Sequence, residues 1–241
     1  MPRRWVKKEL QRNPVGEGVG KALGWVLENK ENVGIGMLVI IILAIFVPVI
    51  VSHQIKINNQ AFKVLFQGEN QFYREKYGKA LKTFRSVYKD HRNTDAVPFA
   101  IFYEGCLHYK KGDYDQVVNT FKKYLQDYAN RPITPQVLAC MGNAYEQIGN
   151  YSEAVKIHKR FIDDFSSNHL TPSIYQALAR SYLKMGQEQN ALDIYRDIDR
   201  LYNSHIWAEL ADYNIERLGG NEENPESESL KESRNDLINE P

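Results

Sequence analysis

The feature of this 241-residue chain that most limits its fold is an internal repeat of 37 residues. The repeat begins at residue 61 and runs without insertion through four repeats, 61–97, 98–134, 135–171 and 172–208. A fixed register is typical of a solenoid, in which no repeat can bury its apolar face alone and each packs on its neighbours. A coincidental helical bundle would show amphipathic periodicity without this register. The pattern therefore predicts an all-α solenoid.

Each repeat is predicted to be a helix, a turn and a second helix. Proline stands at the first position of three repeats, where the first turn of a helix accepts it. A glycine at the fifteenth position allows the tight reversal between the helices. Small residues at the eighth position are expected to let the two helices approach, and bulky residues at the twenty-fourth are expected to fill gaps between repeats. These sets are Pro98, Pro135, Pro172; Gly112, Gly149, Gly186, with Glu75 departing; Gly68, Gly105, Gly142, Ala179; and Phe84, Phe121, His158, Tyr195.

Two stretches carry a resemblance to a known family. Gly112-Asp-Tyr114-x-x-Val117-x-x-x-Phe121 and Gly142-x-x-Tyr145-x-x-x-Gly149-x-Tyr151-x-x-Ala154 resemble tetratricopeptide repeats. The usual repeat has about 34 residues, so the repeats here are longer. The resemblance covers residues 61–208 and implies a solenoid of about four repeats closed by a capping helix that ends at residue 218, which makes 61–218 one repeat domain.

A membrane-spanning helix is predicted before the repeats. Residues 32–52 carry no charge and are centred on the apolar run Met37–Phe46. At about 1.5 Å per residue, such a helix crosses the roughly 30 Å hydrocarbon core of a bilayer. Pro48 lies near its outer end, where a kink is tolerated. A cleaved signal peptide fits less well, because the leader is long and no small-residue cleavage site follows.

The charges around the span predict its orientation. Residues 1–31 carry seven Lys and Arg against four acids, and only Lys56 and Lys63 follow the span closely. The positive-inside rule places the leader in the cytoplasm and the repeats outside it, in the periplasm of a bacterium with two membranes. Residues 20–30 are expected to form a short interfacial helix with Trp25 at headgroup level. Residues 53–60 are expected to be a linker, and the acidic tail 219–241 to be disordered.

The family resemblance implies where partners bind. In such solenoids the first helix of each repeat lines the concave face, chiefly through positions two, five, nine, twelve and thirteen, here called the first-helix face. Mapped onto this chain, the first two repeats give an aromatic half and the last two a polar half. Aromatic anchors suit an extended peptide or a partner helix, and packing of the rings on the chain itself or on a second copy is the alternative. The candidate residues are Phe62, Phe72, Tyr73, Phe99, Phe102, Tyr109, Asn143 and Arg180.

Signals of chemistry are missing from the sequence. The six histidines form no metal-binding or catalytic motif. Cys106 and Cys140 lie outside any CxxC spacing; buried free thiols are favoured for them, and one bridge between them stays open. A net charge of +1 with alternating bases and acids disfavours nucleic acid. The prediction is a protein that is not an enzyme and uses no cofactor or metal.

The order of basic leader, interfacial helix, single span and extracytoplasmic repeats resembles bacterial inner-membrane proteins of the YfgM type. The resemblance implies a scaffold near the Sec translocon that links it to periplasmic chaperones, with membrane or periplasmic proteins as partners. The alternative is a structural component of a large envelope machine that assembles with copies of itself into a homo-oligomer.

Overall fold

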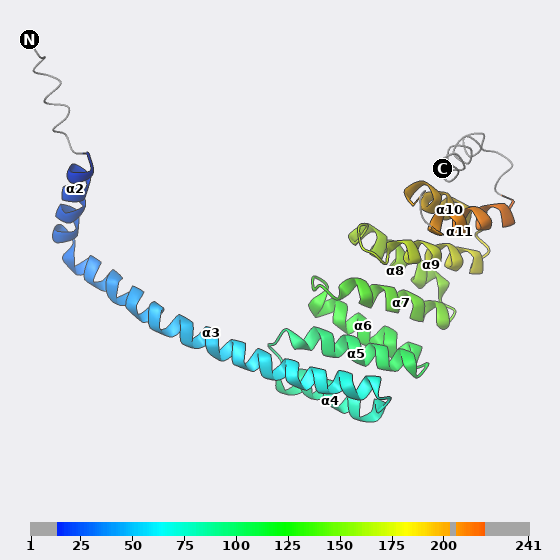
Figure 1. The fold of residues 1–241 in the computed structure, drawn as a ribbon, viewed down its shortest axis with the longest axis horizontal. Coiled ribbons are helices and arrows are strands. Elements are labelled where there is room, and N and C mark those ends of the chain that lie inside the picture. The colour runs from blue at the N-terminus through cyan, green and yellow to red at the C-terminus, as the bar shows by residue number, and fades with distance from the viewer. Residues whose placement is uncertain (1–13, 203–205, 220–241) are drawn as a thin grey trace, which may run out of the picture. The chain divides into compact units, whose positions relative to one another are not determined.

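The computed structural model describes residues 14–202 and 206–219, and these residues are helical, without β-strands (Figure 1). This confirms the predicted all-α class. The first part of the basic leader and the acidic tail from residue 220 lie outside the described residues. The helices are α2 (Pro14–Glu28), α3 (Lys30–Tyr73), α4 (Tyr77–Asp90), α5 (Ala96–Lys110), α6 (Tyr114–Tyr128), α7 (Thr134–Gln147), α8 (Tyr151–Asp164), α9 (Thr171–Lys184), α10 (Glu188–Leu201) and α11 (Ile206–Arg217).

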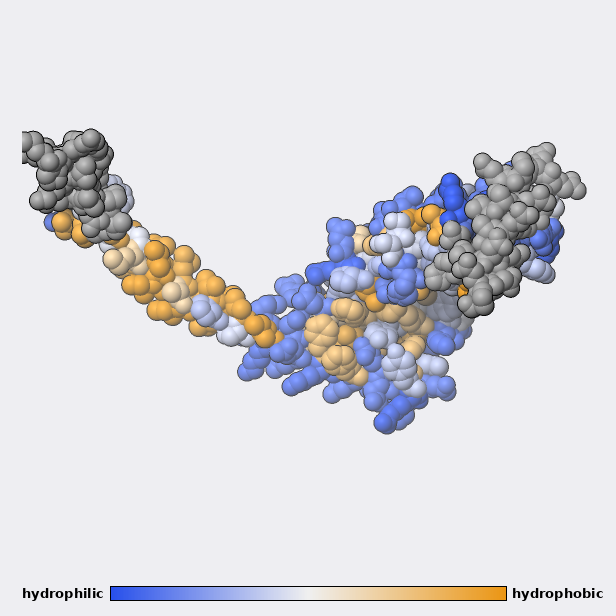
Figure 2. Space-filling view, turned by 45° about the horizontal axis from the view of Figure 1, so that its top comes forward, coloured by the Kyte–Doolittle hydropathy of each residue, from blue (hydrophilic) through white to orange (hydrophobic). Residues whose placement is uncertain are grey.

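The chain divides into two compact parts, residues 1–57 and residues 58–241. In the first part, α2 takes in most of the predicted interfacial helix. The large apolar side chains of α3 from Ile35 to Val51 are exposed, and they form the continuous orange surface in Figure 2. Among the described residues, α3 is the one helix long and apolar enough to cross a membrane, by length and composition alone.

The segment predicted as a linker, residues 53–60, is helical and belongs to α3. The segment from Ser52 to Gln60 contains neither glycine nor proline, the residues that most often end a helix. The division between the two parts, after Ile57, still falls inside these residues.

The second part is the predicted solenoid. The end of α3 pairs with α4 in repeat one, and α5 with α6, α7 with α8 and α9 with α10 form repeats two to four. Each second helix also contacts the first helix of the next repeat, and the helices follow one another in a stack from α4 to α11 (Figure 1). The predicted capping helix is α11, which buries Ala208, Ala211 and Ile215. Ala211 and Ile215 lie in a cluster shared with α9 and α10.

The small residue at the eighth position lies directly beneath the ring at the twenty-fourth position of the same repeat. A Cβ added to Gly105 of α5 would lie 2.2 Å from Cε1 of Phe121 in α6. A Cβ on Gly142 of α7 would lie 2.4 Å from Cε1 of His158 in α8. The bulky twenty-fourth residue therefore fills space inside its own repeat. In repeat one it also packs between repeats as predicted, because Phe84 stacks on Tyr103 of α5 at 5.3 Å.

The turns between paired helices use the left-handed backbone conformation. Gly112, Gly149 and Gly186 have φ angles of 77°, 75° and 70°. At the equivalent place in repeat one, Glu75 has a φ of 59°. Among the described residues, Glu75 is the one with a positive φ that is not a glycine. A side chain in this region meets its own backbone, at a cost of roughly 1–2 kcal/mol.

Replacing Glu75 with glycine is expected to raise the free energy of unfolding of the repeat domain by about 1 kcal/mol, because the steric cost disappears. Urea denaturation of the full chain in detergent, followed by circular dichroism, measures this change. Lys76→Gly is the matched control. Its backbone has a φ of −82°, so glycine there only adds freedom to the unfolded chain and should lower stability. Equal effects of the two variants would contradict the prediction.

Candidate partner-binding surface

All eight predicted residues lie on the first helices of the repeats, within residues 58–241. Phe62, Phe72 and Tyr73 belong to α3, and Phe99, Phe102 and Tyr109 belong to α5. Asn143 is on α7 and Arg180 is on α9. The structure thus distributes them along the solenoid in the predicted order, with aromatic residues in repeats one and two and polar residues in repeats three and four.

Five of the predicted aromatic rings are partly buried by packing within and between the first two repeats: Phe62, Phe72, Phe99, Phe102 and Tyr109. Phe62 of α3 lies 6.1 Å from Phe99 of α5, measured between ring centroids. Phe72 lies 6.1 Å from Tyr103 of α5, and Phe102 stacks on Phe121 at 6.2 Å. Such pairs contribute roughly 0.5–1.5 kcal/mol each beyond their burial. These rings help to hold repeats one and two together, whatever else they contact.

Two rings on α3 are open to solvent. Tyr73 is 72% exposed and Phe66, which the sequence analysis did not select, is 59% exposed. Phe66 borders a shallow depression of about 540 Å³ that is otherwise lined by polar side chains of the same helix, Lys63, Gln67, Asn70 and Gln71. Phe66 stands in repeat one, and within residues 58–219 no repeat precedes it. That place in the array is the signal that could have identified Phe66.

The polar half is organised around the carboxylate of Glu146 on α7, whose side chain is 8% exposed. Arg180 of α9 donates to its Oε2 from Nε at 3.0 Å and from Nη2 at 2.7 Å. Ser181 donates to Oε1 at 2.7 Å, and Nε2 of the fully buried His158 lies 3.3 Å from the same oxygen. Burial alone would raise the pKa of the Glu146 carboxyl, but His158, Ser181 and Arg180 outweigh it and hold that pKa below 4.5. Arg180 therefore joins repeats three and four. Asn143, also on α7, is partly buried.

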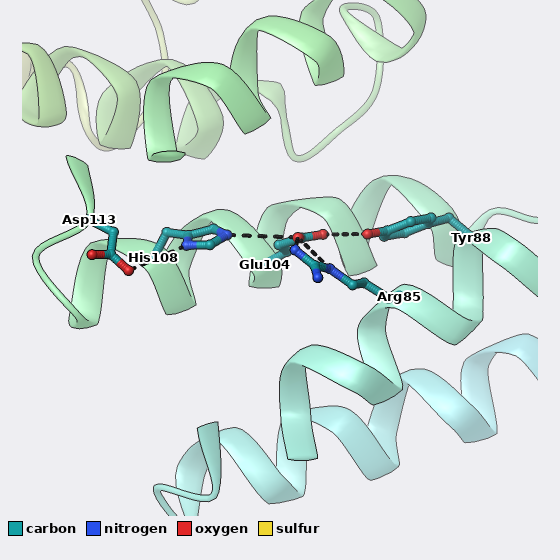
Figure 3. Close-up of polar contacts among 5 residues, drawn as sticks. All are labelled: Arg85, Tyr88, Glu104, His108 and Asp113. Carbon is teal, nitrogen blue, oxygen red and sulfur yellow. Dashed lines mark hydrogen bonds and ion pairs between the residues drawn. The ribbon is translucent and has the colours of Figure 1, made fainter. Parts of the chain in front are cut away.

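A second buried carboxylate, Glu104 of α5, joins repeats one and two (Figure 3). Arg85 of α4 donates to its Oε1 from Nε at 3.0 Å and from Nη2 at 2.8 Å. The Tyr88 hydroxyl donates to Oε2 at 2.7 Å, and burial together with this bond raises the pKa of Tyr88. His108 lies between Glu104 and Asp113, with Nε2 3.7 Å from Glu104 and Nδ1 3.8 Å from Asp113.

The two carboxylate clusters are structural in arrangement. Each glutamate is held by donors from the neighbouring repeat, and its oxygens are occupied by those donors. Glu104 was not predicted as a site residue. The available signal was its position as the single acid within the apolar run from Phe99 to Leu107. Among the described residues there is no group of three or more side chains placed to hold a metal ion.

Comparisons with known proteins agree with this architecture. Two segments match models of the tetratricopeptide repeat, residues 138–163 and residues 172–205. A tetratricopeptide repeat protein from Parabacteroides merdae has a similar crystal structure, with a TM-score of 0.58, 10% identity, and coverage of 68% of this chain and 61% of that one. MamA from Desulfovibrio magneticus RS-1 gives a TM-score of 0.55 at 15% identity, with 76% and 95% coverage. No curated protein matches.

These likenesses establish the fold: residues 58–219 form a tetratricopeptide-repeat solenoid. The chain spans 61% of the length of the Parabacteroides protein. Tetratricopeptide repeats are modules for protein–protein interaction and carry no catalytic centre of their own, which points to a binding function.

Proposed function

We propose that this protein is a membrane-anchored scaffold that binds partner proteins through the aromatic half of its solenoid. The observation that carries the proposal is the pair of exposed rings on α3, Phe66 at 59% and Tyr73 at 72%. Exposed aromatic side chains rimmed by polar groups are typical of a binding surface. The side-chain amides of Gln67 and Asn70 beside Phe66 supply donors and acceptors for the backbone of an extended partner segment.

The apolar part of α3 supports the anchor. Its side chains from Ile35 to Val51 are exposed, as expected of a surface that lipid covers. With the basic leader in the cytoplasm, residues 58–241 lie in the periplasm of a bacterial inner membrane. The resemblance in layout to proteins of the YfgM type favours partners at the Sec translocon and among periplasmic chaperones.

The anchor and its orientation are tested on native membranes. The full chain is expected to stay with the membrane pellet after carbonate extraction. Added protease should degrade residues 58–241 only after the outer membrane is permeabilised. Release by carbonate would contradict the anchor, and protection of the repeats until the inner membrane is broken would contradict the orientation.

The binding surface is tested with the double variant Phe66→Ala, Tyr73→Ala in the full chain. Crosslinking in native membranes followed by quantitative mass spectrometry should show capture of specific partners reduced about tenfold, because anchor rings dominate binding energy. Both side chains are mostly exposed, so the fold is retained, which circular dichroism verifies. Tyr213→Ala is the matched control, since Tyr213 of α11 is 63% exposed at the other end of the solenoid. Unchanged capture in the double variant counts against this surface.

One observation favours the alternative of self-assembly. The outer side of α11 also exposes apolar residues, Ile206 at 72%, Leu210 at 41% and Tyr213 at 63%, although a terminal repeat usually presents a polar face. Two different apolar ends suit a head-to-tail contact between copies. In that case Tyr213→Ala and the double variant should both abolish association in sedimentation of the detergent-solubilised chain, whereas a monomer at high concentration would exclude it.

A further inference from the structure

A pair of thiols lies at the junction between repeats two and three. Cys106 is on α5 and Cys140 is on α7, and these helices contact each other directly. Each thiol shifts the pKa of the other, so the two side chains are near neighbours. Both side chains are partly buried and neither is bonded to another cysteine. The junctions on either side are held by carboxylates, so this junction differs from them in its chemistry.

The packing around the thiols also places Cys140 beside the face of α5 that carries Cys106. Cys140 packs in one apolar cluster with Phe102 and Tyr109. Phe102 precedes Cys106 by four residues and Tyr109 follows it by three, so all three share one face of α5. Cys140 therefore sits against the face of α5 that carries Cys106.

The interaction between the thiols, a hydrogen bond from Cys106 to Cys140, shifts their pKa values in opposite directions. The hydrogen bond donated by Cys106 lowers the pKa of the Cys140 thiol. The same bond, followed by burial, raises the pKa of Cys106. Because the thiolate is the nucleophile in thiol–disulfide exchange, Cys140 is the group that attacks first and Cys106 the group that resolves the intermediate.

We propose that Cys106 and Cys140 form a reversible disulfide that ties α5 to α7, with a small-molecule disulfide as oxidant. The Cys140 thiolate attacks one sulfur of the oxidant, forms a mixed disulfide and releases one thiolate. Cys106 then loses its proton, attacks the Cys140 sulfur and releases the second thiolate. Two protein thiols are oxidised and one small disulfide is reduced to two thiols, so atoms and electrons balance.

This proposal rests on the proposed function in one respect. A repeat domain in the periplasm is in an oxidising compartment, where disulfides persist. The bridge closes the loop from residue 106 to residue 140, which contains all of α6. It fixes the first helices of repeats two and three to each other. The disulfide thereby sets how far the middle of the first-helix face can open or close around a partner.

The test counts thiols in the full chain purified in detergent. After reduction and removal of reductant, the denatured protein should contain two reactive thiols, and after incubation with oxidised glutathione it should contain none. Its intact mass should fall by two hydrogens, without dimers on a non-reducing gel. Oxidation should raise Tm by about 5 °C, since the cross-link restricts the unfolded chain.

Single variants test the order of attack. Cys106→Ser, which retains Cys140, should form a mixed disulfide with glutathione about tenfold faster than Cys140→Ser. Two remaining thiols in the wild-type chain, two separate glutathione adducts, or disulfide-linked dimers would each overturn the proposed bridge. A reversed order of rates would overturn the assignment of Cys140. Since these assays need neither membrane nor partner, their failure is distinct from failure of the proposed function.

Discussion

Replacing Gly105 with alanine is expected to lower the free energy of unfolding of the repeat domain by about 3 kcal/mol, the upper end for overpacking a core. The new methyl group would lie 2.2 Å from Cε1 and 2.3 Å from Cζ of Phe121. Phe121 is fully buried, so its ring cannot move aside without displacing α6 from α5. Urea denaturation followed by circular dichroism measures the loss.

Gly78→Ala is the matched control for Gly105→Ala. Gly78 also lies in a helix, α4, but a Cβ added there meets no atom within 4 Å. Alanine at this position should stabilise the protein by about 0.5 kcal/mol, because it restricts the unfolded chain. Adding Phe121→Leu to Gly105→Ala should restore part of the loss. If Gly105→Ala unfolds like the wild type, the close contact between the eighth and twenty-fourth positions does not exist.

Replacing Glu146 with alanine is expected to lower the free energy of unfolding by about 2 kcal/mol, because buried donors lose their acceptor. Ser181 and His158 are fully buried and would be left facing an apolar methyl group. Arg180 is 53% exposed, so water compensates for part of its loss. Glu153→Ala removes the same charge from a pair with the solvent-exposed Lys156, and this control should cost less than about 0.5 kcal/mol. Equal losses would mean that Glu146 is not the centre of the junction.

The stability that Glu146 contributes should depend on pH. The pKa of its carboxyl is below 4.5 in the folded protein and close to its ordinary value in the unfolded chain, so the unfolded state takes up a proton first as the solution is acidified. The contribution is therefore complete above about pH 5 and is lost as the pH falls through the folded-state pKa. The difference in unfolding free energy between the wild type and Glu146→Ala should shrink below pH 4.5. A constant difference down to pH 3 would contradict the assignment.

The repeat register let most of the fold be predicted, because proline and glycine act locally. Pro135 and Pro172 start helices, and Gly112, Gly149 and Gly186 take the left-handed conformation at the turns. The register did not reveal which positions meet in space, and this is why the contact between the eighth and twenty-fourth positions was not predicted. The helix through residues 53–60 was not predicted, although no glycine or proline interrupts that segment.

The candidate surface was predicted less completely. Positions in the first helices were assigned from the family pattern. That pattern does not distinguish a ring that packs between repeats, such as Phe99, from one that faces solvent, such as Tyr73. Phe66 was missed because exposure at the start of an array depends on the absence of a preceding repeat and not on the repeat position itself. Glu104 was missed because its donors, Arg85 and Tyr88, come from another repeat.

The buried carboxylates also have a consequence for the order of the repeats during folding. An array of similar repeats can mispair by slipping one repeat, which would leave most apolar contacts in place. Such a slip would separate Glu104 from Arg85 and Tyr88. At these two positions the second helix of repeat three carries Lys159 and Ile162, so the donor that Tyr88 supplies would be lost. Glu146 would likewise part from Arg180 and Ser181. Each carboxylate is thus fully matched by one neighbour, and exchanging the order of the repeats would leave hydrogen bonds to a buried carboxylate unmade.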